Sequence, residues 1–462
     1  MKAIIIGMGK SGKAAMYALK DLGYELAVQD SKSPENAEPE IRKFCEENNI
    51  EEFYGAVPED LSAYDMMVLS PGVDPDKDFV VKAKEQGVEV VGELELAYRL
   101  AKGTFIGITG TNGKTTTTSL VGEIFKASGR KSHVVGNIGL PVISIAQDSA
   151  EDDWMVTEVS SFQLQTVSQF RPMVSAILNL TPDHMNRHHT MKAYGEAKAA
   201  IYRAQTEDDY LVLNADDPEL MKRCYYDIPE KPKAKLVFFS LTKKPELGAW
   251  LEGDMLLLKD EQGKTHEILN RNELSIPGDH NVENVLAAAC ICWFSGIPMD
   301  VIAEASKEFK GVEHRLEYVD EIDGVRYYND SKGTNTDASI IAIKALKKDI
   351  ILIAGGDAKM QDFTEYATHL EGPVKHVLLF GRDAWMIRDA MDACGYRDYT
   401  EHADLEECVR YGKEIAEPGD KILLSPACAS WDMYPKFEKR GEHFKDIVKR
   451  LIEEDEKAKE LN

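Results

Sequence analysis

Short apolar runs alternate with amphipathic, helix-like segments along most of this chain. In the first hundred residues the runs are KAIIIG (2–7), ELAVQ (25–29), MMVLSPGV (66–73) and residues 88–91. The alternation returns near the C-terminus at DIILIAGG, KHVLLFG and DKILLSPAC. Buried strands that alternate with helices are typical of mostly parallel sheets with helices on both faces. The pattern therefore predicts an α/β fold.

A chain of 462 residues is too long for one hydrophobic core, so two to three domains are expected. The pattern places boundaries near residue 100 and at the GIP turn (296–298). We predict a Rossmann-like domain over 1–100, a central domain of the phosphate-loop ATPase type over 101–298, and a second Rossmann-like domain over 299–462.

The segment TFIGITGTNGKTTTTS (104–119) has the layout strand, glycine-rich turn, Gly-Lys-Thr, helix. Small residues let backbone N–H groups approach a phosphate, and the helix N-terminus adds positive potential. Lys114 would hold the terminal phosphates and the hydroxyl of Thr115 would ligate Mg²⁺. The loop departs from the common pattern, which places a glycine where this chain has Ile108. We expect a variant nucleotide triphosphate site.

A second glycine pattern, Gly7-x-Gly9-x-x-Gly12, follows the first strand and opens a helix. The next strand ends at Asp30, within the usual window of a ribose-binding acid. This is the dinucleotide fingerprint in its expected context. The same turn can hold any pyrophosphate, so NAD is one of several ligands that fit.

Polar residues follow two strands of the central region. Glu158 ends the apolar run of DDWMVTE, and an acid so close to a phosphate loop suits a Mg²⁺ ligand. His184 lies in a histidine-rich segment whose spacing matches no standard zinc pattern, so Mg²⁺ or substrate contact fits it better. Lys198 flanks the apolar stripe of the next helix, where a snorkelling surface lysine is the simple reading. Asn281 and Asn284 begin a later helix, as caps or as contacts to a base.

Three polar turns follow strands of the last third, at 330–335, 355–359 and 425–430. Turns at the carboxyl ends of neighbouring parallel strands define a crevice where ligands bind. Two of these turns carry lysines. Together they predict a site for an anionic ligand.

Charge and cysteine content limit the partners. The formal net charge of −25 argues against nucleic acid as the main partner, because a phosphate backbone requires a basic surface. The seven cysteines include no C-x-x-C pair, which indicates free thiols in a reducing compartment. The chain begins directly with a strand, and no apolar run approaches the ~18 residues of a membrane span. We expect a cytoplasmic protein with neither a signal peptide nor a membrane span.

The motifs GITGTNGKTT, TEVSSFQL, NLTPDHMNRH, GDHNVENVLAA, HRLEYV, NDSKGTNTDA, AGGDAK and LLSPACASWDMYPKFEKRG occur in this order. Together they resemble the Mur ligases of bacterial peptidoglycan synthesis, over essentially the whole chain. GMGKSG and SPACAS…FEKRG resemble the members that add D-glutamate to UDP-N-acetylmuramoyl-L-alanine. The short TGTNGKT loop of this family also accounts for Ile108.

The resemblance implies ATP-dependent amide formation through an acyl phosphate, with two Mg²⁺ sites. It implies that Lys114 stabilises the transferring phosphate, that Thr115 and Glu158 hold the first Mg²⁺, and that His184 and Lys198 serve the second. Lys198 would be carbamylated, which replaces the snorkelling reading. The implied partners are UDP-N-acetylmuramoyl-L-alanine, D-glutamate and ATP, and we expect a monomer.

The remaining implied contacts divide by ligand. The ATP contacts are Gly110, Thr111, Asn112, Gly113, Lys114, Thr115, Thr116, Asn281, Asn284, Arg315 and Asp330. The UDP-substrate contacts are Gly9, Lys10, Ser11, Asp30, Ser31, Lys32, Gly72 and Asn137. The D-glutamate contacts are Thr334, Lys359, Ser430 and Phe437, with Lys332 beside them. Trp431 follows Ser430 where a smaller apolar residue would also fit.

Three alternatives remain. A sister ligase would add another amino acid, although the Asp-Asn-Pro-Arg motif of the diamino-acid ligases does not occur here. An NAD-binding oxidoreductase or sensor could instead be built on residues 1–100, and a non-catalytic nucleotide-binding scaffold is a third possibility.

Overall fold

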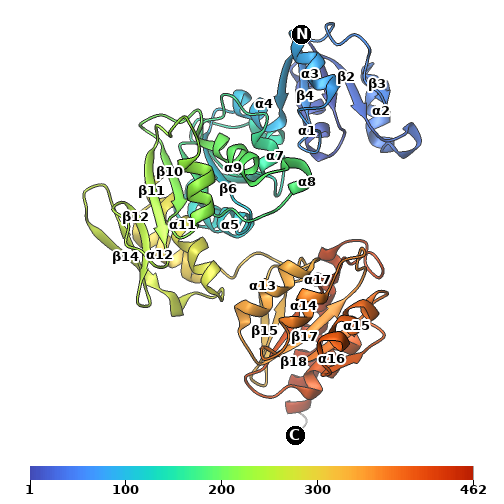
Figure 1. Cartoon of the computed structure of the whole chain (residues 1–462), viewed down its shortest axis with the longest axis vertical. Helices are drawn as coiled ribbons and strands as arrows, with labels where there is room; N and C mark the ends of the chain where they lie inside the picture. Colours follow the sequence, from blue (N-terminus) through green and yellow to red (C-terminus); the bar gives the residue numbers. More distant parts are fainter. Residues whose placement is uncertain (461–462) are drawn as a thin grey trace. The chain divides into compact units, whose positions relative to one another are not determined.

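The computed structural model describes residues 1–460, which form three separate sheets with helices packed on them (Figure 1). The chain divides into two compact units. The first holds Met1–Glu273 and Val282–Lys307, and the second holds Leu274–Asn281 and the chain from Glu308 onward. The expected boundary at residue 298 precedes α12 (Met299–Glu308), whereas nearly all of that helix belongs to the first unit.

The N-terminal sheet is five-stranded and parallel, in the order β3-β2-β1-β4-β5. Its strands are β1 (Lys2–Ile6), β2 (Glu25–Asp30), β3 (Glu51–Tyr54), β4 (Met66–Leu69) and β5 (Glu89–Gly92). Its helices are α1 (Lys10–Asp21), η1 (Pro34–Asn36), α2 (Pro39–Asn48), α3 (Asp78–Glu85) and α4 (Glu93–Leu100). Ile4 and Ile6 pack on one face with α3, and Ala3 and Ile5 pack on the other with α1, as the period of two in a strand requires.

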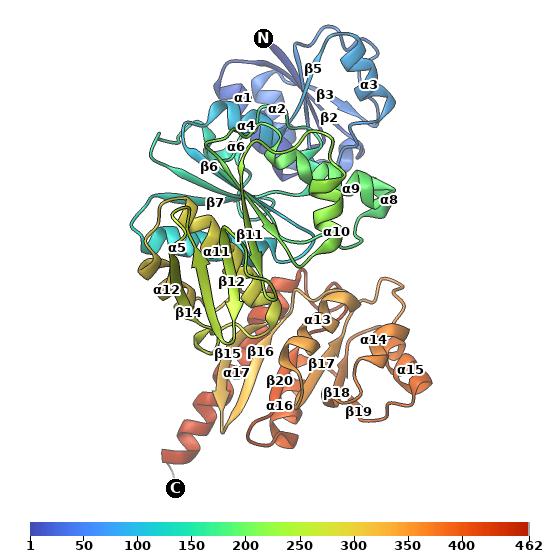
Figure 2. The same ribbon diagram turned by 60° about the vertical axis from the view of Figure 1, so that its left-hand side comes forward.

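The central sheet has nine strands in the order β14-β13-β12-β11-β10-β9-β6-β8-β7. Figure 2 labels β6, β7, β11, β12 and β14 among them. Its strands are β6 (Thr104–Thr109), β7 (Ser132–Gly136), β8 (Trp154–Glu158), β9 (Val174–Ile177), β10 (Tyr210–Asn214), β11 (Lys235–Ser240), β12 (Gly248–Glu252), β13 (Met255–Lys259) and β14 (Thr265–Asn270). Its helical segments are α5 (Lys114–Ala127), α6 (Ile143–Ala146), α7 (Ser161–Leu164), α8 (Met185–His188), α9 (Met191–Ala199), η2 (Ala200–Tyr202), α10 (Pro218–Leu220), η3 (Met221–Tyr226), η4 (Arg271–Glu273) and α11 (Asp279–Phe294). Strands β12, β13 and β14 form an antiparallel meander, whereas β11 is parallel to β10.

The C-terminal sheet has the order β15-β16-β20-β17-β18-β19, parallel except for the β15–β16 hairpin. Its strands are β15 (Glu317–Ile322), β16 (Val325–Asn329), β17 (Ile350–Gly355), β18 (Val374–Phe380), β19 (Tyr399–Glu401) and β20 (Lys421–Leu424). Its helices are α13 (Thr336–Leu346), α14 (Thr364–Thr368), α15 (Ala384–Cys394), α16 (Leu405–Ile415) and α17 (Phe437–Glu460). Helices α13 to α15 cover one face and α16 with α17 the other. The predicted three-domain α/β fold is confirmed at the level of these sheets.

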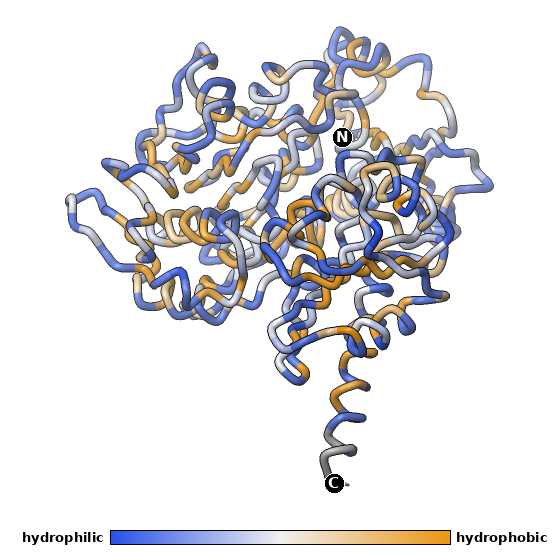
Figure 3. Tube along the Cα trace, turned by 60° about the horizontal axis from the view of Figure 1, so that its bottom comes forward, coloured by the Kyte–Doolittle hydropathy of each residue, from blue (hydrophilic) through white to orange (hydrophobic). Residues whose placement is uncertain are grey.

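Hydrophobic and hydrophilic blocks alternate along α17 (Figure 3). Four residues of α17 are buried in the hydrophobic core that it shares with the sheet: Phe444, Ile447, Val448 and Leu451. Their spacing is that of the apolar face of an amphipathic helix. No helix within residues 1–460 is long and apolar enough to cross a membrane.

Candidate active site

The phosphate loop connects β6 to α5, as the sequence predicts. Gly113 is the N-cap of α5 with φ 79°, and a Cβ there would lie 2.4 Å from Asn284 Oδ1. Asn284 Oδ1 also accepts a hydrogen bond from the Thr117 hydroxyl at 3.2 Å. Glycine is therefore required at this position for two reasons: the positive φ strains other residues, and a side chain would clash with the Asn284 amide. Asn284 packs beneath the loop from α11.

Asn179 anchors the loop and was missed by the sequence reasoning. Its Oδ1 accepts the N–H groups of Thr111 at 3.0 Å and of Asn112 at 2.7 Å, and its Nδ2 donates to Asn112 O at 3.0 Å. It lies just past the end of β9, the strand beside β6. The signal available was the asparagine in NLTPDH, directly after a buried strand.

Two lysines converge on the loop. Lys114 Nζ donates to the carbonyl oxygens of Gly110 at 2.8 Å and Thr111 at 2.7 Å. Lys198 Nζ donates to the same Gly110 oxygen at 2.7 Å and lies 4.6 Å from the Tyr194 ring centroid. Lys198 is only 1% exposed, so the snorkelling reading is wrong. Burial, and after it the charge of Lys114, hold the pKa of the Lys198 amine well below its usual range.

Glu158 ends β8 beside the loop and is buried. Its Oε1 accepts a hydrogen bond from Asn137 Nδ2 at 2.8 Å, whereas its Oε2 is buried without a hydrogen-bond partner in the described residues. A buried carboxylate oxygen that accepts no hydrogen bond is well suited to bind a cation. Thr115, in the first turn of α5, is also buried. The described chain contains no cluster of three His, Cys, Asp or Glu that could hold a metal, so Mg²⁺ would depend on mixed ligands.

The predicted histidines have different environments. His184 has φ 55° and a half-exposed ring, whose Nε2 lies 3.4 Å from Asp183 Oδ2. His188 is buried, with its Nε2 2.9 Å from the Ser161 hydroxyl. Burial lowers the pKa of His188 to about 4. His188 therefore stays neutral and fixes α8, which follows His184.

The N-terminal glycine turn is held by its own acid. A Cβ on Gly12 would lie 2.0 Å from Gly7 O, so only glycine fits there. Asp30 Oδ2 accepts the Met8 N–H at 2.8 Å, and Oδ1 accepts the Lys32 N–H at 2.9 Å. Asp30 thus ties the ends of β1 and β2 together, whichever pyrophosphate ligand binds.

Arg187 links this region to α8. Its Nη2 donates to Val73 O at 2.9 Å and to Gln165 Oε1 at 2.9 Å, and its Nη1 lies 3.5 Å from Gly72 O. The turn at Gly72 is therefore bound to the short helix that follows His184. Gly9 is the N-cap of α1, Lys10 and Ser11 are its first two residues, and Ser31 and Lys32 directly follow β2.

The three predicted turns of the C-terminal unit follow β16, β17 and β20, which are adjacent and parallel. A pair of backbone hydrogen bonds, each 2.9 Å, joins Asp357 to Ala429. Asp330 Oδ2 accepts from the Ser425 hydroxyl at 2.7 Å, and Oδ1 from the Leu316 N–H at 3.1 Å. Burial raises the pKa of Asp330 to about 7. The three turns therefore lie at one edge of the sheet, as predicted.

Arg440 is fully buried and braces two of these turns. Its guanidinium donates to Ser331 O at 2.9 Å and Ser331 Oγ at 3.0 Å, and to Cys428 O at 3.1 Å. It lies in the FEKRG motif, whose pattern alone does not mark this arginine as a buried brace. Beside it, the Ser430 hydroxyl is buried without a hydrogen-bond partner in the described part of the chain, which fits a group that meets a ligand.

Lysines lie against aromatic rings on the same edge. Lys359 Nζ is 4.4 Å from the Trp431 ring centroid, and Lys332 Nζ is 5.6 Å from that of Phe437.

The remaining predicted site residues lie in both units. Thr334 precedes the N-cap of α13. In the second unit Asn281 Nδ2 donates to Pro277 O at 2.7 Å. Arg315 follows His314 and lends favourable charge to Asp330. Thr116 is in the first turn of α5, in the other unit.

Chemically, the first unit combines a phosphate loop, a lysine that reaches over it, a buried amine and an acid with one unused oxygen. The second unit offers two cations and a buried hydroxyl on one sheet edge. These groups suit the binding of a nucleotide triphosphate and of a small anion.

Family models match three stretches of the chain: "Mur ligase MurD-like, N-terminal domain" at residues 1–92, "Mur ligase middle domain" at 108–292, and "Mur ligase, glutamate ligase domain" at 314–428. The chain is 47% identical over 452 residues to the UDP-N-acetylmuramoylalanine–D-glutamate ligase of Alkaliphilus oremlandii, covering 97% of this chain and 98% of that one. It is 46% identical over 456 residues to the Clostridioides difficile protein of the same name, with the same coverage.

Solved structures share the fold. A UDP-N-acetylmuramate-alanine ligase from Thermotoga maritima matches with a TM-score of 0.58 at 20% identity, over 98% of this chain and all of that one (100%). A pseudomurein peptide ligase type C from Methanothermus fervidus matches with a TM-score of 0.55 at 19% identity, over 97% and 99%. The family models and the full-length relatives show that the chain belongs to the Mur ligase family.

Proposed function

We propose that this protein is the ATP-dependent ligase that joins D-glutamate to UDP-N-acetylmuramoyl-L-alanine in peptidoglycan precursor synthesis. The observation that carries the proposal is its full-length similarity, up to 47% identity, to relatives bearing that name. The domain order expected of such an enzyme is a UDP-substrate domain (1–100), an ATP domain (101–298) and an amino-acid domain (299–462). We assign it to the cytoplasm, where its ATP is available, and expect a monomer.

The reaction needs an activated carboxylate. The L-alanyl carboxylate attacks the γ-phosphorus of ATP, which gives an acyl phosphate and releases ADP. The amine of D-glutamate then attacks the acyl carbon, and inorganic phosphate leaves as the amide forms. Both steps gather negative charge on phosphoryl and acyl oxygens, so positioning and charge neutralisation are the protein's task.

Lys114 would leave its two carbonyl acceptors and donate to the transferring phosphate, because an anionic oxygen is a stronger acceptor than a carbonyl. Gly110, Thr111, Asn112, Gly113, Thr115 and Thr116 would supply N–H and hydroxyl donors to the phosphates. Asn281, Asn284, Arg315 and Asp330 would meet the adenosine. Asn137, already bound to Glu158, would orient the UDP-substrate near the first cation site.

Thr115 and the unused Glu158 oxygen would hold one Mg²⁺, and His184 with Lys198 would serve another. Bound there, Mg²⁺ would neutralise charge on the phosphate oxygens. The lowered pKa of Lys198 favours its neutral amine, the form that adds to CO₂ to give a carbamate with loss of one proton. The carbamate would turn a buried amine into an anionic ligand.

Thr334, Lys359, Ser430 and Phe437 would receive D-glutamate, with Lys332 beside them. The Ser430 hydroxyl, which has no hydrogen-bond partner in the described residues, and the lysine over Trp431 support an anionic ligand there.

A panel of precursors and amino acids tests the assignment by phosphate release. We expect ATP turnover only with UDP-N-acetylmuramoyl-L-alanine and D-glutamate together. Stimulation by L-alanine, or by a diamino acid with a later precursor, would support a sister ligase instead. A thermal-shift comparison addresses the N-terminal turn: stabilisation by NADH but not by the UDP-sugar would favour an oxidoreductase.

A further inference from the structure

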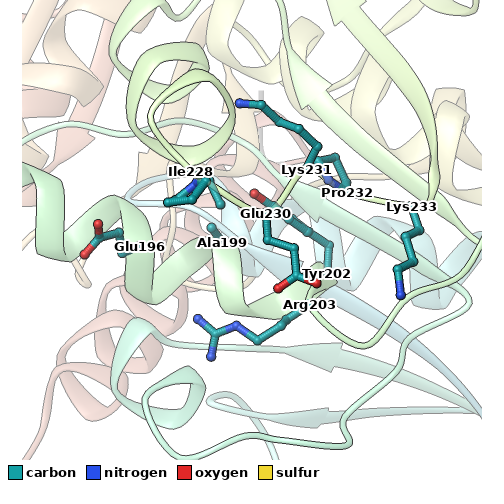
Figure 4. A pocket seen from close by; sticks show the side chains of 10 residues that line it. Glu196, Ala199, Tyr202, Arg203, Ile228, Glu230, Lys231, Pro232 and Lys233 are labelled. Carbon is teal, nitrogen blue, oxygen red and sulfur yellow. The ribbon is translucent and has the colours of Figure 1, made fainter.

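A cavity of about 350 Å³ lies between α9 and the segment that connects η3 to β11. Figure 4 shows Glu196, Ala199, Tyr202 and Arg203 on the helical side and the chain at 228–233 opposite them. The volume is at the lower end of the range for small-molecule sites, roughly 300–1,000 Å³. None of these lining residues belongs to the proposed active site.

The floor of this cavity is apolar. Tyr202 is 3% exposed and its hydroxyl donates to Cys224 O at 2.8 Å, so its polar end is satisfied. Ala199 is also buried, and Ile228 is half-buried beside them. Such a floor favours a flat, apolar ligand body of one or two rings.

The walls are held in place by contacts within the chain. Lys231 Nζ donates to Tyr225 O at 2.7 Å and to Tyr226 O at 2.9 Å, which holds the 228–233 segment against η3. Pro229 and Pro232 restrict its backbone. A Cβ on Gly195 would lie 2.5 Å from Arg223 Cβ, so α9 packs tightly on η3. A preformed cavity lowers the entropic cost of binding.

The rim carries charged side chains, some of which have no ion pair or hydrogen bond in the described part of the chain. Arg203 and Lys233 are exposed, and neither side chain has an ion pair or hydrogen bond among residues 1–460. Glu230 is likewise unpaired in the described chain, whereas Glu196 lies 3.8 Å from Lys192. Two cations therefore face one unpaired carboxylate, in a protein whose formal net charge is −25. Guanidinium and ammonium groups both bind carboxylates through charge-assisted hydrogen bonds.

We propose that this cavity is a second binding site, specific for a small planar apolar carboxylate whose ring rests on Tyr202 and whose anionic end meets Arg203 and Lys233. At about 100° per residue, Glu196 and Ala199 lie on the side of α9 away from Tyr194 and Lys198. The ligand thus contacts the helix of Lys198 from behind, outside the phosphate-loop site.

Calorimetric titration of the full-length protein with 2-naphthoate tests this site, with 2-naphthylmethanol as the neutral analogue. We expect one saturable site for the carboxylate and at least about tenfold weaker binding of the alcohol, because a charge-assisted contact is lost. Arg203→Ala and Lys233→Ala should each weaken 2-naphthoate binding several-fold. Lys264→Ala, an exposed lysine on the β13–β14 turn, serves as the matched control and should leave it unchanged.

Ile228→Trp narrows the cavity and should abolish binding, and an unchanged thermal midpoint verifies that this variant is folded. Binding that persists in Lys114→Ala places the probe outside the phosphate loop. Equal affinity for acid and alcohol, or undiminished 2-naphthoate binding in both rim variants, overturns the proposal. So does the absence of saturable binding.

Discussion

Lys114 and Lys198 share one hydrogen-bond acceptor, the carbonyl oxygen of Gly110, at 2.8 and 2.7 Å. Two ammonium groups so close together repel each other, and Lys198 is the more deeply buried. The pair is therefore best accommodated with Lys198 neutral and Lys114 charged. This division gives one lysine to the phosphate and leaves the other reactive as an amine.

Replacing Lys114 tests whether this lysine serves the transferring phosphate. We expect Lys114→Ala to lower kcat at least about a hundredfold, because a preorganised charge on the phosphoryl oxygens is typically worth about 3 kcal/mol or more in the transition state. Its thermal midpoint should change little, since the ammonium donates to the carbonyl oxygens of Gly110 and Thr111, which both belong to the loop itself. Lys126→Ala, at the exposed end of the same helix, is the control. Undiminished turnover in Lys114→Ala would contradict the enzyme assignment.

Replacing Lys198 tests whether its neutral amine is carbamylated. We expect Lys198→Ala to lose activity and formate or acetate to restore part of it, because the small acid replaces the carboxylate of the carbamate. Steady-state phosphate release with and without the acid measures both effects. The carbamate itself should appear as a ¹³C resonance in wild-type protein equilibrated with ¹³CO₂. That resonance should be missing from the variant, and full activity in the untreated variant would reject the role.

The crevice edges were predictable because strand ends and turns are local in sequence. The turns after β16, β17 and β20 were read from short motifs, and parallel pairing then brings them to one edge. Asn179 and Arg440 were not predictable in the same way. Asn179 binds residues 67 and 68 positions away and Arg440 binds Ser331, 109 positions away. Periodicity carries no information about such long-range partners.

Lys198 illustrates a different limit. Its position on the flank of an apolar stripe is compatible with either a snorkelling or a buried amine. The outcome depends on the phosphate loop of another segment, whose Gly110 carbonyl receives it. The N-terminal fingerprint is limited likewise, because the carboxylate of Asp30 already accepts N–H groups from Met8 and Lys32. Its geometry supports a pyrophosphate turn without specifying the nucleoside.

Glu93 gives a pH-dependent prediction about stability. It is buried at the start of α4, with Oε1 accepting the Ile143 N–H at 2.8 Å and Oε2 lacking a hydrogen-bond partner in the described residues. Burial raises its pKa from 4.5 to about 7. Its stabilising contribution is therefore complete below pH 4.5 and is lost as the pH rises through 7.

Glu93→Gln mimics the protonated form, so the variant should gain stability over wild type as the pH rises from 5 to 8, by at most about 1.4 kcal/mol per pH unit. Denaturant midpoints at several pH values measure this. Glu95→Gln is the matched control on the same helix. Burial pushes the pKa of Glu95 upward, but the N–H groups of Ser168 and Gln169 outweigh it and lower the pKa. Glu95→Gln should thus be destabilised near neutrality and recover on acidification. The same pH trend in both variants would contradict the account of Glu93.

Lys359 and Trp431 make the last prediction, on D-glutamate binding. Lys359 Nζ lies 4.4 Å from the centroid of Trp431, an indole that is 64% exposed. A cation–π contact at an exposed site is worth about 0.5–1 kcal/mol. If Lys359 binds a carboxylate of D-glutamate, it must first leave the ring, so the contact competes with substrate.

Lys359→Ala should therefore raise the KM for D-glutamate while leaving the KM for ATP unchanged. Trp431→Leu should lower the KM for D-glutamate by about two- to fivefold, which is the lost contact expressed as an affinity. Trp385→Leu, another exposed tryptophan of the same unit, should change neither constant. A higher KM for D-glutamate in Trp431→Leu would mean that the indole contacts the substrate itself. The direction of that single change therefore distinguishes an indole that restrains Lys359 from one that forms a wall of the D-glutamate pocket.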